Sequence, residues 1–109
     1  MKNWYQGTIG FRYKDWVGSF YPAGFSPRNF LPYYCKYFNS VELDTTFYSI
    51  PQPATVQSWF NLSPAEFRFS LKTPRQITHE LGLKGAHGLM LEFMDSLHPF
   101  GEKLGPILI

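Results

Sequence analysis

The sequence predicts an α/β fold, a parallel (β/α) barrel of which residues 1–109 form about the first half. Strand-like and helix-like segments alternate along the chain, which favours parallel strands joined by right-handed crossovers. If the three crossover connections have the same handedness, their helices cover only one face of a four-stranded sheet. The other face then needs closure into a barrel, or a partner. We therefore expect a single domain whose C-terminal half is absent. The alternative is an open doubly wound sheet, with helices on both faces.

The first expected strand covers residues 4–9, and a long loop rich in aromatic residues, glycine and proline follows it. Ser26 and Pro27 have the pattern of an N-cap followed by proline at the first helical position. This pattern predicts a helix over about 27–38. Pro32 weakens the middle of that helix or shifts its start, because proline lacks the N–H that a helix interior uses.

The second and third strands are expected at 40–44 and 67–72, each followed by a loop. Between them, a helix over about 54–62 is indicated because Val56, Trp59 and Phe60 share one face. A third helix over about 86–97 has apolar residues at helical spacing, namely Leu89, Met90, Phe93 and Leu97. The wholly apolar segment 106–109 is the fourth expected strand.

Composition and motifs count against several classes of function. The formal net charge of +2 is far from the strongly basic balance of a dedicated nucleic-acid binder. The single cysteine, Cys35, lies in an apolar run and is interpreted as a small buried residue rather than a nucleophile. The sequence has no HxxxH or CxxC spacing, so a metal site would need ligands from separate loops, and the sequence does not identify a cofactor. Without a signal segment or an apolar run of membrane-spanning length, we expect a cytoplasmic protein.

Alternation along the strands predicts which side chains share a face. The apolar faces, which should meet the helices, carry Val41 and Leu43 in the second strand and Phe67, Phe69 and Leu71 in the third. The polar faces carry Glu42 and Asp44, then Arg68, Ser70 and Lys72, and in the first strand Gln6 and Thr8. We expect the polar set to point into the barrel, toward its mouth at the carboxyl ends of the strands.

Glu42 and Lys72 are therefore expected on adjacent strands near the mouth, where active sites of such barrels lie. A carboxyl group beside a cation is typical of a general acid or base whose pKa the cation tunes. A buried ion pair that only fixes the register of the strands is the alternative. His79, in the loop after the third strand, is a candidate proton carrier or metal ligand, or else a surface residue that braces the loop.

Cations interleaved with aromatic residues indicate a site for an anionic, flat or sugar-like ligand. The candidate ligand-binding residues are Tyr13, Trp16, Asp44, Tyr48 and Arg75. Alternatively, the aromatic residues pack the long loops onto the barrel rim, and Asp44 is a solvated or capping carboxylate.

Three blocks of sequence resemble the YecE-like family, also called domain of unknown function 72. The first is Gly-Thr-Ile-Gly-Phe at 7–11 with the aromatic segments that follow at 13–16 and 20–22. The second is Val-Glu-Leu-Asp-Thr-Thr-Phe-Tyr at 41–48, and the third is 67–74 with Ile-Thr-His at 77–79. The resemblance implies a TIM-type barrel about twice as long as this chain, with further site residues in the absent half.

The resemblance also implies site positions at Glu42, Tyr48, Lys72 and His79. The family usually has serine and tryptophan where this chain has Ile9 and Phe11, and asparagine where it has Asp44, so a hydroxyl and an amide contact at the mouth are replaced. The family has no established reaction, so the resemblance names a fold and a site but no substrate.

Two functions follow from these residues. The first is an enzyme that uses Glu42 as acid or base, Lys72 and Arg75 as electrostatic stabilisers and His79 as a second proton carrier, on a phosphorylated or sugar-containing ligand. The second is a non-catalytic binder of nucleic acid or phosphate, which the modest net charge disfavours. If 109 residues is the full length, exposed sheet edges predict self-association.

Overall fold

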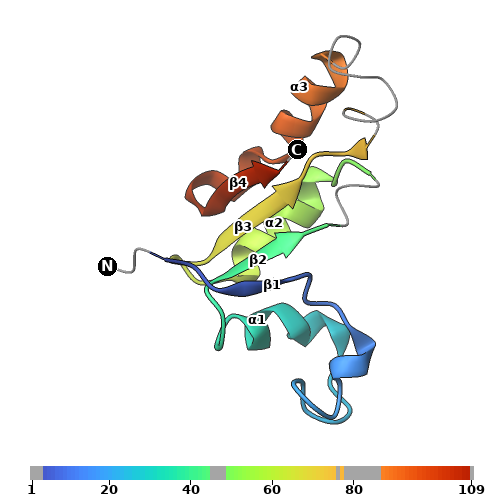
Figure 1. The fold of residues 1–109 in the computed structure, drawn as a ribbon, viewed down its shortest axis with the longest axis vertical. Coiled ribbons are helices and arrows are strands. Elements are labelled where there is room, and N and C mark those ends of the chain that lie inside the picture. Colours follow the sequence, from blue (N-terminus) through green and yellow to red (C-terminus); the bar gives the residue numbers. More distant parts are fainter. Residues whose placement is uncertain (1–3, 45–48, 76, 78–86, 109) are drawn as a thin grey trace.

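A computed structural model describes residues 4–44, 49–75, 77 and 87–108. Its four strands are β1 (Gly7–Ile9), β2 (Ser40–Leu43), β3 (Arg68–Lys72) and β4 (Leu104–Leu108). They form one sheet in the order β1-β2-β3-β4, and each neighbouring pair is parallel (Figure 1). The predicted parallel α/β architecture is therefore confirmed.

The helical segments are η1 (Lys14–Trp16), η2 (Pro27–Asn29), α1 (Phe30–Tyr34), α2 (Pro53–Leu62), α3 (His87–Ser96) and η5 (His98–Lys103). The first helix is shorter than expected, because its start is a 3-10 turn and the α-helix proper begins at Phe30. Pro32 is thus in the first helical turn, where the N–H groups have no partner within the helix. None of the helices in the described part of the chain could span a membrane.

The first and fourth strands differ from the expected bounds for identifiable reasons. At the start of β1, the Asn39 side-chain oxygen accepts a hydrogen bond from the Gln6 backbone N–H at 2.7 Å. This side chain takes the position that a strand neighbour would occupy, so the ladder starts only at Gly7. Along β4, the register against β3 shifts between Phe69 and Leu71. Such a bulge accommodates Pro106, which has no N–H for a regular ladder.

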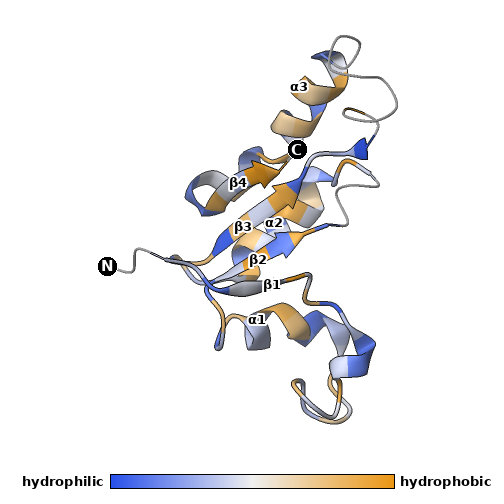
Figure 2. Cartoon of the chain, viewed as in Figure 1, coloured by the Kyte–Doolittle hydropathy of each residue, from blue (hydrophilic) through white to orange (hydrophobic). Residues whose placement is uncertain are grey.

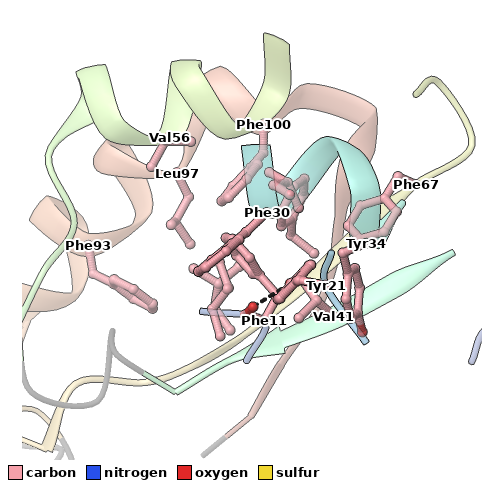
Figure 3. Packing of buried hydrophobic residues seen from close by; sticks show 14 of the residues in the cluster. Phe11, Tyr21, Phe30, Tyr34, Val41, Val56, Phe67, Phe93, Leu97 and Phe100 are labelled. Atoms are coloured by element: carbon pink, nitrogen blue, oxygen red, sulfur yellow. Dashed lines mark hydrogen bonds between the residues drawn. The ribbon is translucent and has the colours of Figure 1, made fainter. Parts of the chain in front are cut away.

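The hydrophobic core lies between the sheet and the helices (Figure 3). Val41 and Leu43 of β2 and Phe69 and Leu71 of β3 all point into it. The helices contribute Phe30, Leu31 and Tyr34 from α1, Val56 from α2, Phe93 from α3 and Phe100 from η5. The alternation that predicted the apolar faces is confirmed, and Figure 2 shows hydrophobic and hydrophilic residues interleaved along the strands.

Among the described residues, no helix covers the opposite face of the sheet, where Glu42, Ser70 and Lys72 are half-buried. The expectation that Thr8 joins this polar set is wrong. Thr8 pairs with Val41, so it points to the helix side. There its backbone N–H donates to the Tyr34 hydroxyl at 2.7 Å, and its own hydroxyl lies 3.0 Å from the same oxygen. The neighbouring residue Ile9 points to the open face instead.

Candidate functional site

A cavity of about 520 Å³ opens at the carboxyl ends of β1 and β2, beside the start of α2. Active sites of parallel barrels are built at this end of the strands, and the volume is within the usual range for small ligands. Among the described residues, its polar lining includes Arg12, Tyr13, Asp44, Ser49, Gln52 and Thr55. Its remaining lining is mostly apolar, with Gly10, Phe11, Leu43, Ile50, Pro51 and Trp59.

The wall formed by the β1 loop depends on a sharp turn at Gly10. This residue has a φ of +77°, in the region that favours glycine, and its N–H donates to the Glu42 carbonyl oxygen at 2.7 Å. A Cβ at Gly10 would lie 2.7 Å from the Tyr13 hydroxyl oxygen. Tyr13 folds back over the turn and donates its hydroxyl hydrogen to the Ile9 carbonyl. The turn therefore positions the phenol ring of Tyr13 at the cavity.

Trp16 lies in the same loop but is not among the residues that line the cavity. Its ring centroid is 4.7 Å from that of Tyr13, 5.6 Å from that of Phe20 and 5.8 Å from that of Tyr21. Tyr21 is fully buried and donates its hydroxyl hydrogen to the Phe11 carbonyl, drawn as the dashed line in Figure 3. This arrangement matches the alternative in which loop aromatics pack onto the rim. A ligand contact at Trp16 stays a prediction.

Glu42 and Lys72 lie on the same open face but are not directly opposite each other. Glu42 is paired with Ile9 on one side and with Ser70 on the other. Lys72 is two residues beyond Ser70, closer to the mouth. Continuing the register beyond the Leu43–Leu71 pair by one residue places Asp44 beside Lys72.

The remaining predicted residues are only partly located. Arg75 is exposed just beyond β3 and does not line the cavity. Tyr48 and His79 lie outside the described residues. Arg12, by contrast, lines the cavity together with Asp44. Within the described ranges, no three His, Cys, Asp or Glu side chains gather closely enough to hold a metal ion.

Sequence reasoning missed three cavity residues at the N-cap and within the first two turns of α2. Gln52, Thr55 and Trp59 line the cavity, although Trp59 was expected only as a core residue of its helix. Trp59 also stacks on Phe69 with ring centroids 6.4 Å apart, so it belongs to both the core and the cavity. The available signal was topological: a helix that follows a parallel strand starts at the same end of the sheet as the site.

A second cavity of about 740 Å³ lies at the other end of the strands, and Cys35 is among its lining residues. Burial raises the pKa of the Cys35 thiol to about 12, although the nearby Lys103 cation acts in the opposite direction. A thiol with this pKa is almost entirely protonated at neutral pH. Cys35 is half-buried and packs against the hydrophobic core, so it is less buried than expected, while its raised pKa argues against a nucleophile.

Comparison with known families identifies relatives of the chain. The family model described as "Protein of unknown function DUF72" matches residues 5–109. Among curated proteins, the chain is similar to the UPF0759 protein YecE of Escherichia coli strain K12. The two are 35% identical over 72 residues, which is 66% of this chain and 26% of YecE.

The chain is also similar to solved structures. A DUF72 family protein from Thermotoga maritima MSB8 matches with a TM-score of 0.78 and 34% identity, over 94% of this chain and 42% of that chain. A DUF72 family protein from Enterococcus faecalis V583 shares the fold, with a TM-score of 0.68 and 23% identity over 89% of this chain and 36% of that chain. The chain thus spans less than half the length of these relatives. Its four parallel strands correspond to half of the eight in a TIM-type barrel.

Proposed function

Because the chain belongs to the DUF72 family of proteins of unknown function, we propose its function from the site itself: an enzyme that binds a small phosphorylated or sugar-containing anion. The observation that carries this proposal is the cavity of about 520 Å³ at the mouth, which combines Arg12 with hydroxyl, amide and aromatic groups. Its position is that of the active site in barrels of this kind.

The lining residues divide naturally between the two parts of such a ligand. The Arg12 guanidinium offers a planar set of donors that suits the oxygens of a phosphate or carboxylate group. The start of α2 adds the partial positive charge of a helix N-terminus on the same side. The hydroxyl groups of Ser49 and Thr55 match the hydroxyl groups of a sugar, and Tyr13 supplies an apolar wall for its ring.

The open face of the sheet carries Glu42 and Lys72, two of the groups that we assign to the proposed reaction. Glu42 acts as general acid or base, and the cations of Lys72 and Arg75 stabilise negative charge that develops in the transition state. His79 is the proposed second proton carrier. The register supports a separation between ligand-binding residues and acid–base residues. Asp44 lines the cavity, and Glu42 is two residues before it on the same face of β2.

Nucleic acid is the less supported ligand. The cavity is concave, and its single described cation, Arg12, shares the lining with the Asp44 carboxylate. A strand or duplex is usually held along a continuous basic surface. The net charge of +2 also disfavours nucleic acid as the ligand.

Replacing Arg12 with alanine is expected to weaken binding of a phosphorylated sugar about tenfold or more, because a charge-assisted pair with phosphate is lost. Isothermal titration of the purified protein with inorganic phosphate, sugar phosphates and the matching free sugars measures this. Lys14→Ala is the matched control, since Lys14 is an exposed cation of the same loop that does not line the cavity. An equal loss of affinity in both variants would contradict an anion site at Arg12. Salt-sensitive binding of oligonucleotides without binding of any sugar phosphate would contradict it too.

Replacing Glu42 with glutamine is expected to lower turnover about 100-fold while leaving affinity nearly unchanged, since the amide keeps the shape but cannot transfer a proton. Phosphorus and proton NMR of the ligands that bind would follow their conversion. Normal conversion by Glu42→Gln would remove Glu42 from the reaction. A panel in which ligands bind and none is converted would contradict the enzymatic part of the proposal.

A further inference from the structure

We infer that Trp59 is the specificity-determining residue of the mouth cavity, because it provides the apolar floor on which the ring of a sugar phosphate packs. This inference rests on the proposed function and names the group that selects the ligand. Trp59 lines the cavity from α2, and Gln52 and Thr55 line it from the same helix and its N-cap. The three positions are spaced by three and four residues, so they share one face of the helix. That face is turned toward the cavity.

Trp59 is the deepest of these three residues. The helix α2 connects the end of β2 to the start of β3, so it runs from the mouth back along the sheet (Figure 1). Gln52 and Thr55 are therefore nearer the mouth, and Trp59 is about one helical turn farther from it. Arg12 also belongs to the mouth, since it follows the carboxyl end of β1. A ligand whose anionic group pairs with Arg12 can extend its ring toward Trp59.

The indole of Trp59 is held by two fully buried phenylalanine rings. Its ring centroid lies 6.4 Å from that of Phe69 and 6.1 Å from that of Phe100, with interplanar angles of 23° and 10°. Phe69 and Phe100 are themselves stacked, with their centroids 4.7 Å apart. Trp59 is only half-buried, and the part that the core leaves uncovered meets the cavity. Because stacking fixes the indole on its inner side, the floor is already in place before a ligand binds.

A flat apolar floor distinguishes ligands by their uncharged part. When the carbon–hydrogen face of a sugar ring packs on the indole, apolar surface of both groups is removed from water. Inorganic phosphate has no such surface, and a second charged group placed against the indole would lose its hydration without gaining a partner. The cavity should therefore prefer a sugar whose only charged group is its phosphate over inorganic phosphate. Trp59 supplies this preference, whereas Arg12 contributes to the binding of both ligands.

Fluorine NMR of protein prepared with 5-fluorotryptophan tests the contact directly. The chain has three tryptophans, and the variants Trp4→Phe and Trp16→Phe assign their resonances. The ligands are glucose 6-phosphate, ribose 5-phosphate, the two free sugars and inorganic phosphate. We expect the sugar phosphates to shift the Trp59 resonance, whereas inorganic phosphate should bind with little change there. The Trp4 resonance is the internal control, because Trp4 lines the second cavity at the other end of the strands.

Calorimetric titration of Trp59→Leu measures the preference itself. We expect this variant to weaken binding of the sugar phosphates about tenfold and binding of inorganic phosphate less than about twofold. Phe60→Leu, at the next residue of the helix, is the matched control, because Phe60 does not line the cavity and its loss should leave both affinities unchanged. The NMR experiment keeps Trp59 in place, so it decides even if Trp59→Leu does not fold.

Failure of this inference can be told apart from failure of the proposed function. The inference is overturned, while an anion site at Arg12 stands, if sugar phosphates bind but leave the Trp59 resonance unchanged, or bind no more tightly than inorganic phosphate. An equal loss for both kinds of ligand in Trp59→Leu overturns it as well. If none of the phosphorylated ligands binds, the proposed function fails and the inference fails with it.

Discussion

The substitution Gly7→Ala is expected to destabilise the fold by about 3 kcal/mol, because the added methyl group has no space. Gly7 on β1 is paired with Ser40 on β2. A Cβ built at Gly7 would lie 1.9 Å from the Ser40 carbonyl oxygen and 2.6 Å from its carbonyl carbon. Both are backbone atoms, which cannot move aside as a flexible side chain would. The two strands would therefore have to separate.

Chemical denaturation followed by circular dichroism measures this loss. Gly88→Ala is the matched control, because a Cβ there meets no atom within 4 Å and the residue is in α3. Alanine favours a helix over glycine, so this variant is expected to gain up to about 1 kcal/mol. Similar stabilities for the two variants would show that β1 is not held closely against β2. The mouth cavity would be affected too, since β1 leads into the Gly10 turn.

The faces of β2 and β3 could be predicted from the sequence because strand geometry has a period of two residues. Val41 and Leu43 are apolar, while Glu42 between them is charged. Only one orientation of the strand therefore places its apolar side chains in the core. The first strand lacks such a contrast. Thr8 lies between Gly7 and Ile9, and its position on the helix side follows only from pairing with Val41 and from its contacts with Tyr34.

The stagger between neighbouring strands could not be predicted, because alternation assigns a face but not a level along the strand. This is why Glu42 is found opposite Ser70, with Lys72 two residues closer to the mouth. For a similar reason, the sequence could not show which of the predicted ligand-binding residues line the cavity. Tyr13 lines the cavity and Trp16 does not, although both are aromatic residues of one loop. Their difference comes from the turn at Gly10, a tertiary feature of the β1 end.

A buried cation, Lys103, was also hidden from sequence reasoning. Lys103 follows Gly101 and Glu102, where a charged residue normally points to solvent. It is only 6% exposed, and its ammonium group donates to the carbonyl oxygens of Phe60 and Ser63, both at 2.7 Å. A third contact, to Ser63 Oγ, is 3.2 Å long. These partners are distant in sequence, so no local pattern could indicate them.

Replacing Lys103 with methionine is expected to destabilise the fold by about 2 kcal/mol, because the carbonyl groups at the end of α2 lose their donor. The last carbonyls of a helix have no partner within it, and a cation there also opposes the helix dipole. The ammonium group additionally stands 4.0 Å from the centroid of the Phe60 ring. Burial lowers the pKa of Lys103, so holding this cation has a cost, and methionine recovers part of it.

The net effect therefore depends on which of the two contributions is larger. Three acceptor contacts on one ammonium group, two of them 2.7 Å long, indicate that the lost hydrogen bonds exceed the recovered desolvation. A comparison of the free energies of unfolding of Lys103→Met and Lys36→Met shows which contribution is larger. Lys36 is exposed, and its replacement should change stability by less than about 0.5 kcal/mol. If Lys103→Met were as stable as that control, Lys103 would not be the group that secures α2 against η5.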